Sequence, residues 1–474
     1  MSFKIAFIGA GSLVFTRTLF TDIISVPEFK NIQIAFTDIN PENLARVTEL
    51  CQRDLTANGI PIQIQADMDR RKAFAGARYI VNCVRIGGLE GFETDIDIPL
   101  KYGVDQCVGD TLCIGGIMYG QRVIAAMLDF CKDIREVAEP GAIMLNYSNP
   151  NAMATWACNK YGGVKTIGLC HGEIHGEQQI AEALGIPHSE LDFICAGLNH
   201  QTWYISVKHQ GKDMLDKILP AYEASAELTH SEPVRIDMLR RFGFYSTESN
   251  GHLSEYLAWY RKRPDEIPAW ICTDSWIGGE TGGYLRTTRE SRNWFDTDYP
   301  KIAAEPPRRF DGSQRGKEHG SYIIEGLETG RRYRGHFNVM NEGCISNLPK
   351  ECVVEVPCYV DGNGISVPTV GELPLACAAI CSQSAWVQRL SVEAAVKGDV
   401  TLLKQAALLD PLTGAVCNPP EVWQMVDEML IAQSEWLPQY KKAIADAEER
   451  FSKGELLPTR ENYRGSVRFE DNTN

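Results

Sequence analysis

The sequence of 474 residues lacks any apolar run of about 18 residues, the length that a membrane-spanning helix needs. It also lacks a surplus of basic residues: 62 acidic against 47 basic residues give a net charge of −15, which disfavours nucleic acid as a partner. The chain does not open with a leader of the secretory type, since only a short apolar run separates Lys4 from Gly9. We therefore expect a cytoplasmic protein without a membrane or nucleic-acid partner.

The fifteen cysteines are an odd number and are spread through segments of strand and helix type. Without a secretion signal they are expected to be free thiols in a reducing compartment, most of them small core residues. Hydrophobic residues make up 44% of the chain and charged residues 23%, which is typical of a globular protein with two or three domains.

A glycine-rich turn follows the first apolar run of the chain, residues 5–8. Gly9 and Gly11 allow a tight turn and a close approach of the backbone to a pyrophosphate. The stretch after Ser12 is expected to be a helix whose positive N-terminus faces that phosphate. The usual dinucleotide fingerprint is incomplete, because Phe15 stands at its third glycine position. The turn alone is compatible with a glycine turn that binds no ligand.

A second strand strengthens the dinucleotide hypothesis. Residues 32–38 are predicted to form a strand that ends in Asp38, at the place where an acid binds the adenosine ribose. An acid there favours NAD over NADP. Gly9, Gly11, Ser12 and Asp38 are therefore the predicted cofactor-binding residues.

Polar side chains are predicted at the ends of three later strands. Arg85 ends one strand, Asn149 follows the next, and Cys170 and His171 end the segment 164–172. Ligands in open α/β sheets bind outside the carboxyl ends of the strands, so these residues are expected near the nicotinamide. Arg85 is predicted either to contact substrate or cofactor, or only to cap a loop.

Residues 193–207 are predicted to be one strand that carries His200. Cys170 and His200 would offer a thiolate and an imidazole, which suit ions such as Zn, Fe, Co and Mn. Two ligands are too few for a structural zinc site but fit a catalytic site that substrate hydroxyls complete. The alternative is a buried thiol and a hydrogen-bonded histidine that bind no metal.

With these residues in place, the chain resembles glycoside hydrolase family 4 over nearly its whole length. The resemblance is carried by the segments FIGAGS, TDIN, GDTLCIGGI, NYSNPNAM, GLCHG and GLNH, and by later NLP and VEVP elements. It implies an α/β fold similar to lactate and malate dehydrogenases, with a Rossmann-like NAD-binding domain (1–198) and a mixed α/β substrate and oligomerisation domain (199–474). It also implies NAD, Mn²⁺ or another divalent metal, an α-glycoside substrate, and a homodimer or homotetramer.

The resemblance also implies a mechanism that departs from two-carboxylate hydrolysis. NAD⁺ oxidises the sugar at C3, a base removes the acidified C2 proton, and the metal stabilises the enolate. The glycosidic oxygen then leaves, water adds, and the ketone is reduced again. In this scheme Cys170 and His200 match the metal ligands and Asn149 matches a substrate contact. Asp110 matches an acid near the site, with a turn or cap role as the alternative.

The residues after Cys170 resemble the branches that cleave unphosphorylated α-glycosides. Phosphosugar members have Asn or Asp where this chain has His171, and the segment 246–259 resembles the corresponding stretch of α-galactosidases. Gly172 departs from that branch, which commonly has Ser there. We therefore predict an exo-acting α-galactosidase, with α-glucoside and α-uronide substrates left open.

The acid and the base stay open at this point. His171 occupies the place of a proposed acid in phosphosugar members and suits proton transfer near neutral pH. Tyr256 and Tyr245 lie near the place of the family's tyrosine base, and Glu248 and His252 are alternatives. Each of these also fits a plain role on a helix face or in a loop.

Trp203 and Trp259 are predicted to stack on sugar faces or, as is more common for aromatic residues, to lie in the core.

Two other functions were weighed against the glycosidase. A hydroxy-acid or sugar dehydrogenase would release NADH and need no thiolate metal site. Such enzymes place an Arg and a His–Asp pair at the reaction centre, and we find no such set in the sequence. A non-catalytic NAD-binding regulator would leave Asn149, Cys170 and His200 without a purpose.

Overall fold

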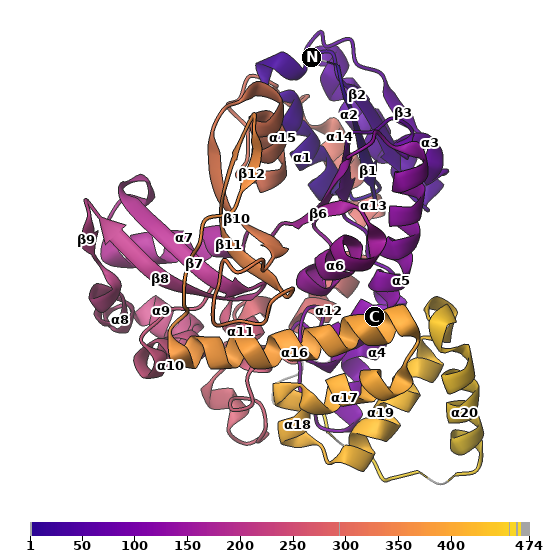
Figure 1. The fold of residues 1–474 in the computed structure, drawn as a ribbon, viewed down its shortest axis with the longest axis vertical. Coiled ribbons are helices and arrows are strands. Elements are labelled where there is room, and N and C mark those ends of the chain that lie inside the picture. Colours follow the sequence, from indigo (N-terminus) through magenta and orange to yellow (C-terminus); the bar gives the residue numbers. More distant parts are fainter. Residues whose placement is uncertain (1, 293, 455, 461–462, 466–474) are drawn as a thin grey trace.

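The structure, a computed structural model, describes residues 2–292, 294–454, 456–460 and 463–465. In these residues one twelve-stranded sheet runs through the molecule in the order β3-β2-β1-β4-β5-β6-β10-β11-β7-β8-β9, with β12 paired to β11 (Figure 1). The strands are β1 Lys4–Ile8, β2 Gln33–Thr37, β3 Ile64–Ala66, β4 Tyr79–Asn82, β5 Ile143–Asn146, β6 Lys165–Gly168, β7 Leu191–Leu198, β8 Gln201–His209, β9 Lys212–Asp213, β10 Tyr333–Met340, β11 Val353–Asp361 and β12 Gly364–Ser366.

Twenty α-helices surround this sheet in the described part of the chain. They are α1 Leu13–Ile24, α2 Pro41–Ala57, α3 Arg70–Phe74, α4 Gly88–Lys101, α5 Cys113–Val137, α6 Asn151–Ala157, α7 Gly172–Leu184, α8 Leu215–Ala224, α9 Ala226–Ser231, α10 Pro233–Phe242, α11 Asn250–Tyr256, α12 Gly283–Glu290, α13 Trp294–Thr297, α14 Tyr299–Ala304, α15 His319–Thr329, α16 Leu375–Lys397, α17 Val400–Leu409, α18 Pro411–Val416, α19 Pro419–Ala432 and α20 Lys441–Ser452.

The N-terminal half of the sheet is parallel and has the strand order of a dinucleotide-binding domain. The pairs β1–β2, β1–β4, β2–β3, β4–β5 and β5–β6 are all parallel. Alternate residues of β1 enter two cores: Ile5 and Phe7 pack on the side of α1 and α2, whereas Ala6 and Ile8 pack on the side of α5. A sheet covered on both faces needs such continuous apolar strands, and the predicted Rossmann-like fold is confirmed.

The sheet continues through antiparallel strands after β6. Here the prediction of a single strand over 193–207 is wrong. The segment folds back at Asn199 and His200, so that β7 and β8 form a hairpin in which Leu198 pairs with Gln201. His200, the second central residue of the turn, has a φ of 63°, the left-handed conformation that this position has in a type II turn. The alternating apolar pattern on both sides of the turn hid it from the sequence reading.

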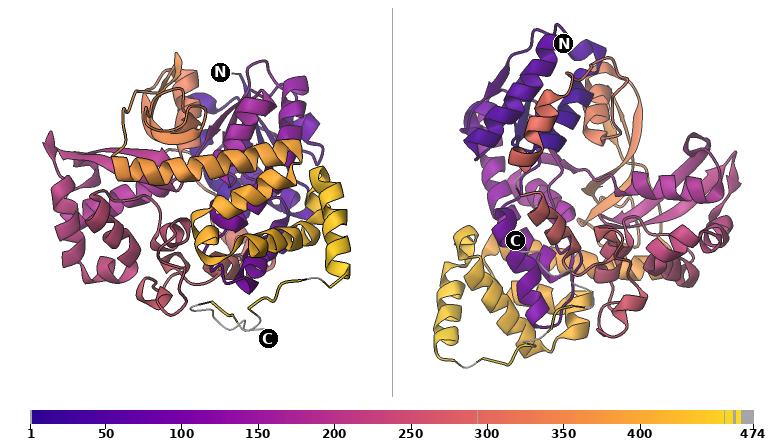
Figure 2. Two further views of the ribbon diagram at one scale, coloured as in Figure 1. Left: turned by 60° about the horizontal axis from the view of Figure 1, so that its bottom comes forward. Right: turned by 180° about the vertical axis from the view of Figure 1, so that it is seen from behind.

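The C-terminal helices form a second core at the end of the molecule below the parallel sheet, seen in orange and yellow in Figures 1 and 2. Side chains of α16, α17 and α19 pack there against the facing ends of α4 and α5. The buried Arg122 of α5 forms a two-pronged ion pair with Asp95 of α4, which accepts at 2.6 and 2.9 Å. This pair fixes the two helices next to the loop that carries Asp110.

All fifteen cysteines lie in described residues, and each is a free thiol. None of the described helices combines the length and the apolar character that crossing a bilayer requires.

Candidate active site

A cavity of about 900 Å³ opens at the carboxyl ends of the parallel strands and is closed on the other side by the β7–β8 turn and by α7, α10 and α11. It brings together most of the predicted site residues. Those that line it are Ser12, Arg85, Asp110, Asn149, Cys170, His171, His200, Glu248 and His252.

The predicted dinucleotide turn lies at the edge of this cavity. The N–H of Gly11 donates to the Asp38 carboxylate over 2.8 Å, so the turn after β1 and the acid after β2 are directly linked. A Cβ atom on Gly9 would come within 2.9 Å of the Cys83 carbonyl group, and one on Gly11 within 2.9 Å of the Asp38 carboxylate. Only glycine fits at these two positions, as a turn that lets a pyrophosphate approach the backbone requires.

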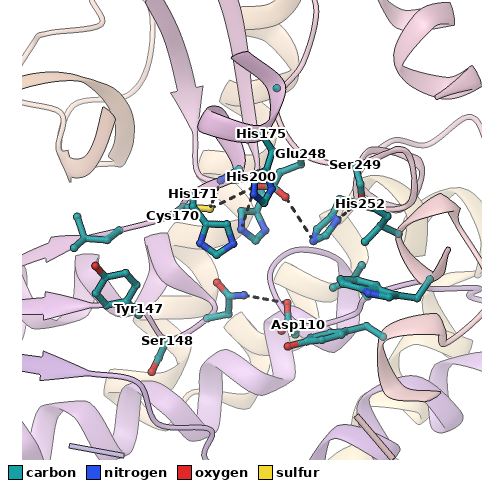
Figure 3. Close-up of a pocket in the computed structure, with 18 of the residues that line it drawn as sticks. Asp110, Tyr147, Ser148, Cys170, His171, His175, His200, Glu248, Ser249 and His252 are labelled. Atoms are coloured by element: carbon teal, nitrogen blue, oxygen red, sulfur yellow. Dashed lines mark hydrogen bonds and ion pairs between the residues drawn. The ribbon is translucent and has the colours of Figure 1, made fainter. Parts of the chain in front are cut away.

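Three metal-ligand side chains converge at the cavity wall (Figure 3). The Cys170 Sγ atom lies 3.4 Å from Glu248 Oε1, and His200 Nε2 lies 3.5 Å from the same oxygen. All three ligand atoms lie within 4.8 Å of one another. Cys170 follows β6, His200 forms the β7–β8 turn, and Glu248 precedes α11. The predicted pair Cys170 and His200 thus meets, and a carboxylate joins it.

The backbone and the charges at this triad are unusual. His200 and Glu248 both have positive φ values, 63° and 68°, which non-glycine residues adopt rarely and mostly at functional sites. Burial by itself would raise the pKa of Glu248, but the neighbouring histidines, chiefly His200 and His252, lower it to about 2. Burial and the Glu248 carboxylate raise the pKa of the Cys170 thiol well above its ordinary value. A thiolate here therefore needs a compensating cation, which fits a metal-binding donor set.

Gly172 makes room for the third member of the triad. A Cβ atom at this position would come within 1.7 Å of Glu248 Oε1. Any side chain at position 172 would therefore displace the carboxylate from Cys170 and His200. The departure from Ser at this position has a physical reason in this chain.

Asp110 lies opposite the triad and links two other predicted residues. Its carboxylate accepts from Arg85 Nη2 over 2.9 Å and from Asn149 Nδ2 over 3.2 Å. The Arg85 guanidinium also lies over the rings of Tyr119 and Tyr284, at 5.4 and 5.3 Å from their centres. The three polar groups form one network on the cavity wall, so Asp110 does more than cap a turn.

The remaining candidates divide into those that reach the cavity and those that do not. His252 lines it, with Nε2 3.8 Å from Glu248 and Nδ1 2.6 Å from Ser249 Oγ, and burial lowers the His252 pKa to about 4. His171 lines it as well, with Nδ1 3.5 Å from Glu318. Tyr256 is not among the lining residues.

Tyr256 lies behind the metal-ligand triad instead. It is buried, and its hydroxyl is 3.5 Å from His200 Nδ1, on the opposite edge of the ring from Glu248. Tyr245 is also buried away from the cavity wall, against the Arg235 guanidinium. The position of Tyr256 is that of a partner that orients a metal-binding histidine.

Neither Trp203 nor Trp259 lines the cavity, so stacking on a sugar, the less common of their two predicted roles, is not supported. Trp203 is fully buried and stacks on Phe242, whereas Trp259 lies against Phe242 from the surface side. The aromatic wall of the cavity is formed by Trp276 and Tyr284, whose rings stack at 4.8 Å.

The sequence reading missed Trp276, Tyr284, Gln179 and Arg235, all of which line the cavity. Gln179 lies on α7, Arg235 on α10, and Trp276 and Tyr284 in the segment after α11, and no motif next to them in the sequence marks them. Arg235 forms an ion pair with Glu232 over 3.0 Å, so its charge is already balanced.

Family models match this chain over most of its length. The model described as "Family 4 glycosyl hydrolase" matches residues 4–186, and the "Family 4 glycosyl hydrolase C-terminal domain" matches residues 195–413. The chain belongs to this family. The resemblance seen in the sequence is thereby confirmed, and with it the prediction of a glycoside hydrolase.

Relatives and solved structures agree with the family. An alpha-galactosidase of Rhizobium meliloti (strain 1021) is 58% identical over 99% of this chain and 96% of its own length, and an alpha-galactosidase of Bacillus subtilis (strain 168) is 34% identical over 92% and 100%. The 6-phospho-beta glucosidase of Thermotoga maritima, solved with manganese, NAD⁺ and glucose-6-phosphate, superposes with a TM-score of 0.75 at 23% identity, over 91% of this chain and 99% of that one. The solved structure shares the fold of the chain described here.

Proposed function

We propose that this family 4 protein is an exo-acting α-galactosidase that depends on NAD and on a divalent metal, Mn²⁺ in the first place. The observation that carries the proposal is the meeting of Cys170, His200 and Glu248 beside the dinucleotide turn, in a chain 58% identical to an alpha-galactosidase. Structures with the same fold contain NAD with manganese.

The metal is held by Cys170, His200 and Glu248. Three ligands leave coordination positions open for two substrate oxygens, as in catalytic sites generally. Tyr256 keeps His200 oriented through its Nδ1 atom and is a positioning residue. NAD is held by Gly9, Gly11 and Ser12 at its pyrophosphate and by Asp38 at its adenosine ribose. When bound, NAD supplies a reversible hydride acceptor and the metal supplies positive charge next to a developing enolate oxygen.

The cavity suits a neutral sugar. Among the described residues that line the cavity, two are basic side chains of the Lys or Arg type, Arg85 and Arg235. Arg85 is already paired with Asp110, and Arg235 with Glu232. A phosphosugar or a uronide would need a cation of its own. Asp110 and Asn149 offer an acceptor and a donor to sugar hydroxyls, and the ring of Trp276 offers a surface for the apolar face of a galactoside.

For the proton transfers we propose His252 as the base at the sugar C2 and His171 as the acid at the leaving oxygen. Both line the cavity next to the triad, whereas Glu248 is used by the metal and Tyr256 lies behind it. If Nδ1–H of His252 donates to Ser249 Oγ, the lone pair is on Nε2, which lies 3.8 Å from Glu248 Oε2 at the cavity wall. A base at C2 exchanges that proton with solvent.

Two further expectations belong to this proposal. The protein is cytoplasmic, where reducing conditions keep the Cys170 thiol free, and it forms a homodimer or homotetramer. Its NAD-binding domain spans residues 1–198 and its substrate and oligomerisation domain residues 199–474, a division that follows the end of β7 at Leu198. Light scattering after size exclusion measures the subunit number.

The experiment is a hydrolysis series with p-nitrophenyl α-galactoside, α-glucoside and α-galacturonide, in the presence of NAD⁺, Mn²⁺ and a thiol. We expect nitrophenol from the α-galactoside, none when either cofactor is omitted, and no net NADH. Steady NADH formation without nitrophenol would instead indicate a dehydrogenase. In deuterated buffer, galactose should gain deuterium at C2, and His252→Gln should abolish both turnover and this exchange. Exchange retained in that variant would exclude His252 as the base.

A further inference from the structure

A second group of metal-ligand side chains lies outside the cavity, on α9 (labelled in Figure 1) and on the segment before Trp276. His230 belongs to α9, and Cys272 and Asp274 belong to the segment between α11 and Trp276. His230 Nε2 lies 3.3 Å from Cys272 Sγ and 2.7 Å from Asp274 Oδ2. The three ligand atoms lie within 4.8 Å of one another.

The spacing of Cys272 and His230 is that of two ligands of one transition metal, whereas the 2.7 Å between His230 and Asp274 is that of a hydrogen-bonded ion pair. Zinc bound tetrahedrally to a thiolate at about 2.3 Å and an imidazole at about 2.0 Å holds these two atoms about 3.5 Å apart. Cys272 Sγ and His230 Nε2, 3.3 Å apart, already have about that spacing, and Asp274 Oδ2 would have to move away from His230 Nε2 by about half an ångström to reach the spacing of two zinc ligands. A buried thiol plays no part in a pairing of His230 with Asp274 alone, yet here it points at the same ring nitrogen.

The site is reachable and has room for further ligands. The side chains of His230 and Asp274 are 63% and 76% exposed, while Cys272 lies beneath them. A thiolate, an imidazole and a carboxylate together favour a borderline-soft ion such as Zn²⁺ over Mg²⁺ or Ca²⁺. We propose that His230, Cys272 and Asp274 form a second divalent-metal site, of zinc type, separate from the catalytic triad.

Both chain segments that carry this site continue into residues that line the cavity. Asp274 lies two residues before Trp276, and His230 lies two residues before Glu232; both of these neighbours line the cavity. The Cys272 N–H donates to the Gly278 carbonyl over 3.1 Å, which closes the loop that carries Trp276. An ion bound to all three ligands would therefore tie the Trp276 loop to the start of α10. The metal site itself does not depend on the proposed galactosidase activity.

The test measures metal content in full-length protein in which the catalytic site is disabled in every sample. Metal-free Cys170→Ser protein and its double variant with Cys272→Ser are dialysed against Zn²⁺ and analysed by mass spectrometry. We expect the double variant to bind about one Zn²⁺ per chain fewer. Cys170→Ser with Cys344→Ser, which removes another buried thiol, is the matched control and should keep that ion. Equal zinc in the first two proteins would overturn the proposal.

Three further measurements keep the result independent of folding defects. The exposed substitutions His230→Gln and Asp274→Asn, in the Cys170→Ser background, should each weaken Zn²⁺ binding by about tenfold or more. With Co²⁺, the thiolate charge-transfer band should be present in Cys170→Ser and absent once Cys272 is replaced. Zn²⁺ should also slow hydrogen exchange of residues 270–279, and unchanged exchange with bound zinc would refute the tie to the Trp276 loop.

Discussion

Glu255 fixes the loop in front of Asp110, and Glu255→Gln should loosen it. The fully buried carboxylate of α11 accepts the backbone N–H groups of Cys107 over 2.6 Å, Val108 over 2.9 Å and Gly109 over 3.0 Å. The next residue is Asp110, whose carboxylate faces the cavity. Glu255 thus connects the C-terminal half of the chain with the site built on the parallel sheet, without touching the cavity itself.

The size of the effect follows from the three hydrogen bonds. A glutamine of the same shape keeps one acceptor oxygen and places an NH₂ group where the other oxygen stood, so one or two buried N–H groups lose their acceptor. Each such loss costs about 1–3 kcal/mol, and we expect a total of about 2–5 kcal/mol. A shift of Asp110 by about 1 Å would in addition lower kcat/KM by about a hundredfold.

The loss should depend on pH. Burial raises the pKa of Glu255 from 4.5 to about 7, although the backbone N–H groups and Arg261 act against it. The folded protein then holds this proton to a higher pH than the unfolded chain does. The contribution of this proton to the free energy of unfolding is fully present below about pH 4.5 and is lost as the pH rises through about 7. The free energy of unfolding changes by about 3 kcal/mol over that range. Glutamine has no such proton, so the difference between the two proteins should narrow as the pH rises.

Urea unfolding of both proteins from pH 5 to pH 8 measures this difference, with the exposed Glu448→Gln in α20 as the control for loss of one charge. We expect Glu255→Gln to unfold at lower urea than the wild type, most clearly at pH 5. Equal midpoints at every pH would refute the role given to Glu255. A gap that widens toward pH 8 would refute the direction of its pKa shift.

Three other substitutions test separate parts of the structure. Asp38→Ala should weaken NAD binding by about tenfold, because one hydrogen bond to the ribose is lost, and should leave Mn²⁺ binding unchanged in calorimetry. Equal weakening of both would contradict the separate sites. Gly172→Ser should displace Glu248 and weaken Mn²⁺ binding by about tenfold or more with normal NAD binding, and wild-type Mn²⁺ affinity would contradict the crowding. Asp95→Asn should leave the buried Arg122 charge uncompensated and lower the free energy of unfolding by about 3–5 kcal/mol, and an unchanged urea midpoint would contradict it.

The part of the site that rests on the parallel sheet could be predicted from the sequence. Each of its residues follows directly after an apolar strand, and the rule that such ends share one edge of a sheet places Asn149 and Cys170 together without further knowledge. The link between Gly11 and Asp38 is of the same kind. These positions are set by local pattern and by one topological rule.

The other wall could not be predicted in this way, because long connections bring it to the cavity. Glu248 lies 78 positions after Cys170 and contacts it only after the chain has passed through the β7–β8 hairpin and the four helices α7 to α10. Trp276 arrives on an irregular loop with no periodicity. For Trp203 the more common of the two predicted places, the core, is correct, since a strand position that alternates inward is buried whether or not a ligand is near.

Gly172 and Glu248 show how a departure from a family pattern gains meaning from structure. Read alone, a glycine in place of serine beside Cys170 weakens the assignment to a branch. In the structure the missing side chain is the space that the Glu248 carboxylate occupies, with a Cβ atom 1.7 Å from it. A serine at 172 and a carboxylate from the loop before α11 therefore exclude each other at this place. In this chain the space left by the missing side chain brings the Glu248 carboxylate next to Cys170 and His200.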